Sequence, residues 1–376
     1  MPRAAFIYED SLSRHELRSD HPMRPVRLRY TYQLLQEYGA FDHPDAVLLD
    51  PRSATEAELA WLHTAEYVAA VKALGSGAPG GIDGARFGFS GQGDNPVYPK
   101  MFEAAALSTG GSLLAAEMVA SGEVSAAFNI SGGLHHAAAG HASGFCVFND
   151  PALAIHYFLN QGKRIAYVDI DAHHGDGVQE AFYADDRVLT ISVHESGQWL
   201  FPGTGSVSEL GEGAGRGYSV NLPLYPYTSD DDYIDAFSRV VPPLIRAFAP
   251  DVLVTQLGID SYHSDPLTHL QVTTEGYIEA VRQLAGLGLP WLALGGGGYD
   301  VNAVARAWTL AYGVMLGADW PDQLPPEFVR EHGAGRLRDE LKPEVPPDVK
   351  VDVRRYLEDT IAEIRQQIFP FHGLGG

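Results

Sequence analysis

The sequence predicts a three-layer α/β/α fold built around a central, mostly parallel β-sheet. Short runs rich in Val, Ile and Ala recur along the chain, and segments of helical character separate them. Several of these runs end in clustered polar residues, as expected where the carboxyl ends of parallel strands surround a ligand site. The alternation implies right-handed crossovers, which place helices on both faces of the sheet.

The predicted strands share one composition, because each is a short apolar run of the kind that a parallel sheet buries on both faces. They are VSAAFNIS (124–131), RIAYVDID (164–171), RVLTISVH (187–194), DVLVTQLGID (251–260) and PWLALGGGG (290–298). Longer segments with helical character lie between and around them, at 101–121, 151–161, 230–249, 274–287 and 301–317. This order is the one that βαβ units require.

We expect one domain over residues 1–320, although a chain of 376 residues could hold two. A C-terminal extension is expected at 321–376. Within it, three prolines at 343, 346 and 347 precede an amphipathic segment at 352–368, which predicts a terminal helix packed on the same domain. The glycine-rich stretch 75–99 predicts a long loop, and long loops in compact domains are often functional.

The chain is acidic, with 48 Asp and Glu against 26 Lys and Arg and a formal net charge of −22. This charge disfavours direct binding to nucleic acid and favours basic partners.

The single cysteine, Cys146, excludes an intramolecular disulfide and a cysteine-rich metal site, so any metal must bind His, Asp or Glu. Without a signal-peptide pattern or an apolar stretch of about 18 residues, we expect a cytoplasmic protein that does not bind membranes. The sequence leaves the oligomeric state open.

Polar residues gather where four of the five predicted strands end, at the edge where parallel α/β sheets bind ligands. The first strand is followed by His135 and His136, and the fourth ends at Asp260. The fifth runs into the glycines 295–298 and Tyr299; these glycines lack phosphate-loop patterns and predict a tight turn beneath a site. The second strand ends in the densest group, which contains Asp169, Asp171, His173 and Asp176.

Asp171 and His173 stand two residues apart at a strand end, so in extended geometry both side chains leave the same face and can share one ion. Asp260, which ends another apolar strand, has the chemistry and position of a third ligand. One imidazole and two carboxylates suit Zn²⁺ or Fe²⁺ and leave room for water and substrate, as a catalytic metal needs. The plainer alternative, unrelated polar residues at strand ends, is disfavoured by the density of the group.

The adjacent His135 and His136 offer a general base and an acid or electrostatic partner, because imidazole titrates near neutrality. Asp169 and Asp176 are candidates to orient the two rings. Tyr299 is a poor base, with an ordinary pKa of about 10, but its hydroxyl can donate a hydrogen bond to a developing oxyanion. These residues predict an acid–base site beside the metal.

Eight motifs are spread along the chain. They are HPMRPVR (21–27), GDNPVYP (93–99), SGGLHHA (131–137), SGFCVFN (143–149), DIDAHHGDG (169–177), FPGTG (201–205), GID with DPL (258–260 and 265–267) and LGGGGY (294–299). With these motifs in family order from about residue 5 to 320, the sequence resembles the histone deacetylase family of zinc amidohydrolases, and within it the bacterial acetoin-utilisation (AcuC-like) branch related to class I deacetylases. The resemblance implies an arginase/deacetylase-like fold.

The resemblance also implies roles for individual residues. The metal ligands map onto Asp171, His173 and Asp260, the three that the strand ends select. The implied catalytic groups are a His135–Asp169 dyad, a His136–Asp176 dyad and Tyr299, which would polarise the scissile carbonyl. The implied substrate-binding residues are Asp94 at the mouth of an acyl-lysine tunnel, Gly144, Phe145 and Phe201 along its walls, Leu267 at its rim and Arg27 near an internal channel for acetate release.

Two kinds of metal ion are implied as cofactors. Zn²⁺ is the expected catalytic ion, and Fe²⁺ fits the same ligands. Structural potassium ions are expected at two sites, one involving Asp169 and Ser192 and the other using carbonyls near Phe182 and Val188. The chain departs from many eukaryotic relatives at Gly93, where they carry an aromatic residue before the rim aspartate, and this leaves the shape of the mouth and the choice of substrate open.

These implications predict a zinc-dependent lysine deacetylase that hydrolyses Nε-acetyl-lysine in proteins to lysine and acetate, with acetyl-CoA synthetase as a client. The acidic composition is compatible with basic substrate segments. An amidohydrolase for small acetylated amines, such as acetylpolyamines, is the close alternative. A binuclear manganese ureohydrolase would need a complete second ligand set, which we do not find. An inactive acyl-lysine-binding module would be expected to have lost a ligand or the tyrosine, and none is lost.

Overall fold

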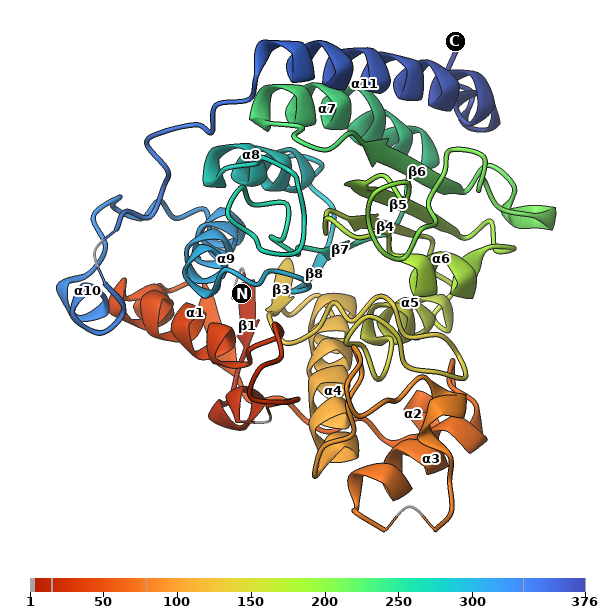
Figure 1. Cartoon of the computed structure of the whole chain (residues 1–376), viewed down its shortest axis with the longest axis vertical. Helices are drawn as coiled ribbons and strands as arrows, with labels where there is room; N and C mark the ends of the chain where they lie inside the picture. Colours follow the sequence, from red (N-terminus) through yellow and green to blue (C-terminus); the bar gives the residue numbers. More distant parts are fainter. Residues whose placement is uncertain (1–3, 15, 79, 334, 376) are drawn as a thin grey trace.

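The computed structural model describes residues 4–14, 16–78, 80–333 and 335–375. In these residues eight strands form one sheet, parallel throughout, in the order β2-β1-β3-β8-β7-β4-β5-β6 (Figure 1). They are β1 (Ala4–Ile7), β2 (Ala46–Leu49), β3 (Ala126–Asn129), β4 (Ile165–Asp169), β5 (Val188–Glu195), β6 (Ser219–Leu224), β7 (Val252–Gln256) and β8 (Trp291–Leu294). The predicted α/β class with a mostly parallel sheet is confirmed.

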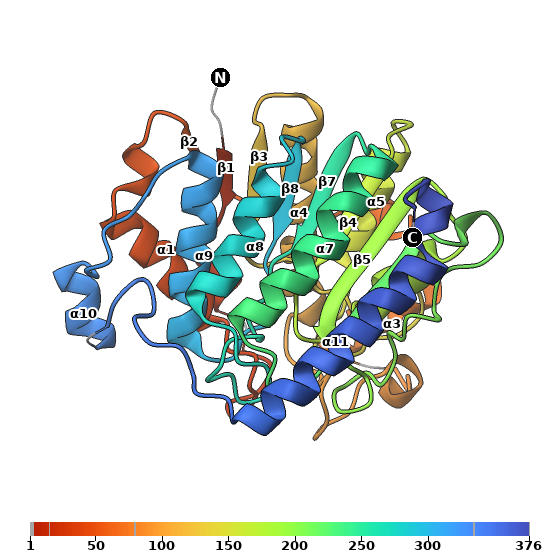
Figure 2. The same ribbon diagram turned by 90° about the horizontal axis from the view of Figure 1, so that it is seen from above.

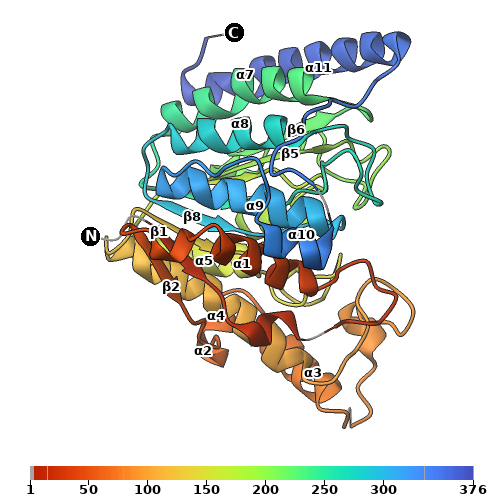
Figure 3. The same cartoon turned by 90° about the vertical axis from the view of Figure 1, so that its left-hand side faces the viewer.

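Helices cover both faces of the sheet (Figures 2 and 3). One face carries α4 (Met101–Ala120), α5 (Asp150–Leu159) and α6 (Asp176–Phe182). The other carries α1 (Val26–Glu37), α7 (Asp230–Phe248), α8 (Thr274–Ala285), α9 (Val301–Leu316) and α11 (Pro347–Gln367). Successive residues of β1 enter opposite cores, Phe6 on the α9 side and Ile7 on the α4 side, because side chains alternate along a strand.

Shorter elements lie outside these layers. The helices α2 (Glu56–Leu59) and α3 (Ala65–Gly75) precede α4, on which α3 packs, and α10 (Pro326–His332) packs on α1. Single 3₁₀ turns occur at Asp10–Ser13, Ala40–Asp42, Gly84–Phe87, Gly213–Gly215 and Phe369–His372.

The five predicted strands and five predicted helices are present with shifted ends, and three strands were not predicted. The fourth and fifth predicted strands stop early, at Gln256 and Leu294, because the backbone then leaves the sheet to build the site. Strand β1 was missed although the predicted strands β3 and β8 are equally short, whereas β2 is only partly buried and lacks the pattern of a strand covered on both faces. Strand β6 contains Pro223 and lies at an edge of the sheet, where a missing N–H is tolerated.

The helix α11 runs along α7 and the edge strand β6 (Figures 1 and 2). It begins at Pro347, five residues before the predicted start at 352, because proline is well suited to the first turn of a helix. Its buried side chains include Val353, Leu357, Ile361 and Ile364, which join the core beneath α7. Among the described residues, none of the helices combines the length and the apolar character needed to cross a membrane.

Candidate active site

The carboxyl ends of four adjacent strands, β3, β8, β7 and β4, meet at one edge of the sheet. The chain leaving β3 supplies the two histidines, the chain leaving β8 the glycine run, and the chain leaving β7 Asp260. The chain leaving β4 supplies Asp171, His173 and Asp176. The parallel topology therefore gathers side chains that are far apart in the sequence.

Three of these groups form a cradle for one ion. One ligand atom each of Asp171, His173 and Asp260 lies within 4.8 Å of the others, and all three residues are buried. The Nδ1 atom of His173 stands 3.0 Å from Asp171 Oδ1 and 2.9 Å from Asp260 Oδ2. Burial and the charge of Asp171 raise the pKa of Asp260 to about 7, so the buried carboxylates repel one another unless a cation lies between them. Donors and charge therefore fit a divalent metal of the zinc type.

Amide groups hold the two carboxylates in place. Asp171 Oδ2 accepts hydrogen bonds from Gln256 Nε2 and from the backbone N–H of Gly297, each at 2.6 Å. Asp260 Oδ1 accepts from the N–H of Ala172 at 2.7 Å. Position 297 requires glycine, because a Cβ there would stand 2.0 Å from Asp260 Oδ2. The glycine run thus lets the backbone pass directly against the cradle.

His135 and His136 form a hydrogen-bonded pair beside the cradle. The Nδ1 atom of His135 lies 2.7 Å from Asp169 Oδ2, and that of His136 lies 2.7 Å from Asp176 Oδ1. The two Nε2 atoms are 3.0 Å apart. Since an ionised carboxylate only accepts, each Nδ1 donates, and one Nε2 must carry the proton of the bond between the rings. One ring of the pair is therefore a cation.

The surroundings of the two rings decide which one is charged. Burial acts to lower the pKa of His135, but the charges of Asp169 and Asp171 outweigh it and raise that pKa to about 9. Burial and the neighbouring His135 lower the pKa of His136 to about 4. At pH 7 His136 is the neutral ring, with an unprotonated Nε2, which is the state that a general base requires.

One phenylalanine lies beside this pair and another beside Tyr299. The ring centre of Phe201 lies 5.1 Å from that of His136, and Phe201 is 42% exposed. The ring of Phe145 lies 5.7 Å from that of Tyr299 and is nearly perpendicular to it. Gly144 packs so closely that a Cβ would stand 2.3 Å from the His136 ring. The structure therefore places these three predicted substrate-binding residues around His136 and Tyr299.

Tyr299 is anchored through its backbone. Its N–H donates to Asp265 Oδ2 at 2.8 Å, and the other oxygen of Asp265 accepts from the N–H of Leu267 at 2.9 Å. One carboxylate thus ties the tyrosine to the predicted rim residue. Burial, reinforced by Asp260 and Asp171, raises the pKa of Tyr299 well above its ordinary value, so its hydroxyl keeps its proton and can donate.

Asp94, the residue predicted at the mouth, is held through its backbone by a histidine that we did not predict. The backbone N–H of Met23 donates to His21 Nδ1 at 3.0 Å, so Nε2 of His21 carries the proton and donates to the Asp94 carbonyl at 3.1 Å. The His21 ring also packs on Phe145, with centres 4.5 Å apart. His21 therefore links Asp94 to Phe145. Its only sequence signal is its place in the HPMRPVR motif.

Two further supporting residues were missed. Asp265 stands in the DPL motif, where its charge could have been noticed. Gln256 is the last residue of β7, a buried amide at the end of an apolar run, and that position was its available signal.

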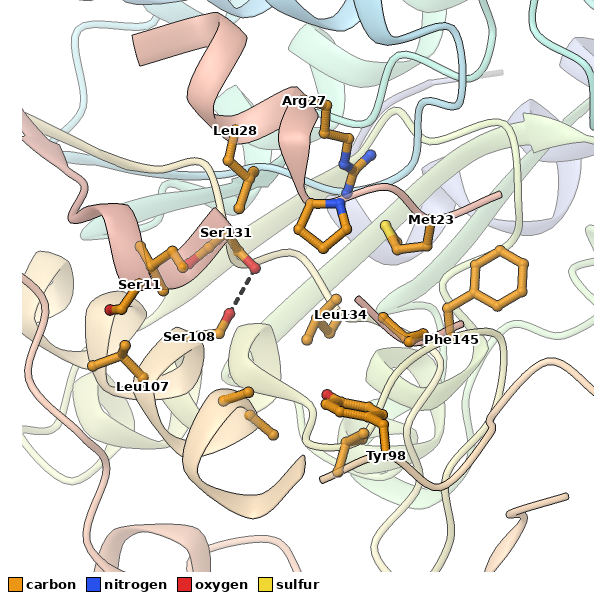
Figure 4. A pocket seen from close by; sticks show the side chains of 16 residues that line it. Ser11, Met23, Arg27, Leu28, Tyr98, Leu107, Ser108, Ser131, Leu134 and Phe145 are labelled. Atoms are coloured by element: carbon orange, nitrogen blue, oxygen red, sulfur yellow. Dashed lines mark hydrogen bonds between the residues drawn. The ribbon is translucent and has the colours of Figure 1, made fainter. Parts of the chain in front are cut away.

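A cavity of about 100 Å³ lies behind the wall, lined mainly by apolar side chains (Figure 4). It shares Phe145 with the wall and also contacts Met23 and Arg27. The Arg27 guanidinium is buried, donates to the carbonyl of Gly298 at 2.8 Å and packs over the Trp308 ring at 5.2 Å. The structure thus places Arg27 between this cavity and the glycine run.

Comparisons with known proteins agree with this architecture. A family model described as the histone deacetylase domain matches residues 21–315. The chain is 44% identical over 336 residues to the acetoin utilization protein AcuC of Bacillus subtilis (strain 168), covering 88% of this chain and 86% of that protein. It is 36% identical over 339 residues to the protein of the same name from Staphylococcus aureus (strain MSSA476), with the same coverage.

Solved structures give the same result for the whole fold. An HDAC homolog crystallised with SAHA has a TM-score of 0.87 and 30% identity, covering 97% of this chain and 100% of that one. An HDAC homolog from Aquifex aeolicus has a TM-score of 0.87 and 30% identity, covering 96% and 99%. The resemblance that the motifs indicated is confirmed.

Proposed function

The chain belongs to the histone deacetylase family of metal-dependent deacetylases, and we propose that its substrate is Nε-acetyl-lysine in proteins, hydrolysed to lysine and acetate. The observation that carries this proposal is the buried cradle of Asp171, His173 and Asp260 directly beside the His135–His136 pair. We also propose that the protein works in the cytoplasm, where acetyl-CoA synthetase is a client worth testing first.

We propose Zn²⁺ as the native ion, held by the three cradle residues, with Fe²⁺ as the other ion that suits them. When bound, the ion supplies Lewis acidity, which polarises the acetyl carbonyl and lowers the pKa of water.

The chain's own groups then move protons. His136 Nε2 exchanges its hydrogen bond with His135 for one with the attacking water and takes a proton from that water, and Asp176, which accepts from Nδ1 of the same ring, stabilises the resulting cation. The Tyr299 hydroxyl donates to the oxyanion that develops on the carbonyl oxygen. The His136 imidazolium next protonates the leaving lysine nitrogen, which restores the neutral ring. His135 stays cationic against Asp169 and adds positive charge near the reacting atoms.

We propose that the remaining predicted residues guide the substrate and product. Gly144, Phe145 and Phe201 flank the acyl-lysine chain, while Leu267 and Asp94 contact the substrate outside the tunnel. The cavity beside Arg27 offers an exit for acetate, because a guanidinium stabilises a departing carboxylate.

Two further assignments belong to this proposal. Structural potassium would bind near Asp169 and Ser192, which pair across β4 and β5, and near the carbonyls of Phe182 and Val188. Residues 1–320 would be the catalytic domain and 321–376 an extension that packs on it through α11.

The experiment is to measure acetate release by the metal-loaded protein from an acetyl-lysine peptide and from acetylputrescine, side by side, and to compare kcat/KM. We expect a strong preference for the peptide. A reversed preference would make the protein an acetylpolyamine hydrolase and overturn the substrate assignment. The Asp260→Ala variant serves as the control for contaminating activity.

A further inference from the structure

Phe201 lies on a loop formed by residues 196–209, which follows β5 and is called the Phe201 loop below. The Phe201 ring stands 5.1 Å from the ring of the proposed base, His136. Any shift of the loop therefore changes the width of the proposed substrate tunnel next to His136. The contacts that hold the loop therefore affect how well the substrate fits.

Polar groups anchor the second half of the loop. Glu209 Oε1 accepts from the N–H groups of Gly205 and Ser206, at 2.9 and 3.0 Å. The Thr204 hydroxyl lies 2.8 Å from Nδ1 of the buried His174. All of these contacts come after Phe201 in the chain, so they fix only one side of it.

Aromatic contacts hold the first half. The ring of Trp199 packs edge-on against Tyr225, at 4.9 Å between centres, and against Tyr356, at 5.8 Å. The two tyrosine rings are 5.5 Å apart, which closes a three-ring cluster. Tyr225 follows the edge strand β6, whereas Tyr356 belongs to α11.

A groove of about 430 Å³ lies between the loop and α11, lined by loop residues and by Tyr356, Asp359, Thr360 and Glu363 of the helix. Because this hollow separates loop and helix along much of their length, the three-ring cluster bridges them. The helix itself is secured by buried residues on another side, including Leu357 and Ile361. Removing the Tyr356 ring would therefore loosen the part of the loop around Trp199 without detaching the helix.

We infer that Tyr356 is a positioning residue for the substrate tunnel: through Trp199 it fixes the Phe201 loop and thereby sets the affinity for the acyl-lysine chain. The choice of substrate rests on the proposed function, whereas the bracing of the loop does not. Tyr356 lies beyond residues 21–315, the range that the family model matches. The C-terminal extension thus braces a tunnel wall that belongs to the family domain.

Steady-state kinetics with an acetyl-lysine peptide test this role. The Tyr356→Ala variant should raise KM about 3- to 10-fold, the size expected for losing aromatic pair contacts, and leave kcat within about twofold. Tyr356→Phe keeps the ring and should restore most of the affinity. Val351→Ala, at a position of α11 that is 64% exposed, is the matched control and should behave like the wild type. An unchanged KM in Tyr356→Ala, or an equal rise in Val351→Ala, would overturn the inference.

A second measurement needs no turnover and so separates this inference from the proposed function. Acrylamide quenching of tryptophan fluorescence is compared between the wild type and Tyr356→Ala, each with and without Trp199→Phe, so that the difference isolates Trp199. We expect Tyr356→Ala to make Trp199 more accessible and Tyr356→Phe to restore protection. Equal accessibility in all variants would refute the bracing even if the protein deacetylates lysine.

Discussion

The floor and the mouth of the site are built in different ways. The floor, meaning the segments that directly follow β4 and β7, carries Asp171 and Asp260. These residues are at most 1% exposed and accept hydrogen bonds from amide groups. The predicted mouth and outer wall consist of loops, where Phe201 is 42% exposed and the nearby Trp199 packs in an aromatic cluster. A floor fixed by the sheet preserves one chemistry, while loops above it can change substrate fit without disturbing that chemistry.

The largest effect is expected where the floor loses a metal ligand. Asp260→Ala removes one of three ligands and should lower kcat/KM by at least about 10⁴-fold, since both the Lewis acid and the acidified water are lost. Metal analysis after dialysis should show about one ion per chain in the wild type and almost none in the variant. Asp359→Ala on α11 is the control. Full metal content in Asp260→Ala would remove this residue from the cradle.

The next effect concerns the tyrosine above the floor. Tyr299→Phe removes only the hydroxyl, because the anchoring hydrogen bond to Asp265 comes from the backbone. We expect kcat to fall about 10²- to 10³-fold with KM changed by less than about threefold, since the donated bond strengthens in the transition state. Steady-state kinetics on the peptide check this. A variant with the wild-type kcat would exclude Tyr299 from oxyanion stabilisation.

A smaller effect is expected at the junction of floor and wall, where the buried His63 supports residues 138–149. Its Nδ1 lies 3.1 Å from the Ala138 carbonyl, and its Nε2 accepts from the N–H of Asn149 at 3.0 Å, so the folded state holds the ring neutral. Burial lowers its pKa to about 4. The unfolded chain binds a proton below about pH 6.5 and the folded one does not, so this contribution to stability is complete above pH 6.5 and declines as the pH falls toward 4.

Urea unfolding at pH 7 and pH 5 measures this contribution. Between these two values the wild type should lose about 2 kcal/mol more of its unfolding free energy than His63→Asn, whose side chain does not titrate. Equal losses in the two proteins would show that His63 is not held neutral in the folded state.

The smallest effect is expected in the outer wall. Phe201→Ala should raise KM for the peptide about 10-fold through lost apolar contact, with kcat changed by less than about threefold. If kcat instead fell as steeply as in Tyr299→Phe, the wall would take part in the chemistry, and the division between floor and mouth would fail.

The floor could be predicted from the sequence because its chemistry is concentrated in short segments after apolar strands. Asp171 and His173 share one segment, and parallel topology alone brings Asp260 to the same edge. The residues that hold these site residues in place by hydrogen bonds could not be predicted in the same way. Gln256 binds Asp171, and His21 binds the Asp94 carbonyl, each through a tertiary contact across more than 70 residues of chain.

The mouth was predicted only through motif resemblance, and the contact between Tyr356 and Trp199 was not predicted. The amphipathic pattern near the C-terminus predicted a packed helix, but it does not distinguish Tyr356 from other half-buried positions on that helix. Its contact with Trp199 depends on how α11 crosses the edge of the sheet. Among the strands, β2 was missed because it is an edge strand that is only partly buried.

Anomalous X-ray diffraction at the zinc edge, from crystals of the zinc-loaded protein, tests the central claim most directly. The account predicts one strong peak at about 2.0–2.3 Å from His173 and from both cradle carboxylates, Asp171 and Asp260. The account would be contradicted by a strong peak at another place in the protein, if Asp171 and Asp260 then kept only their present hydrogen bonds and bound no zinc.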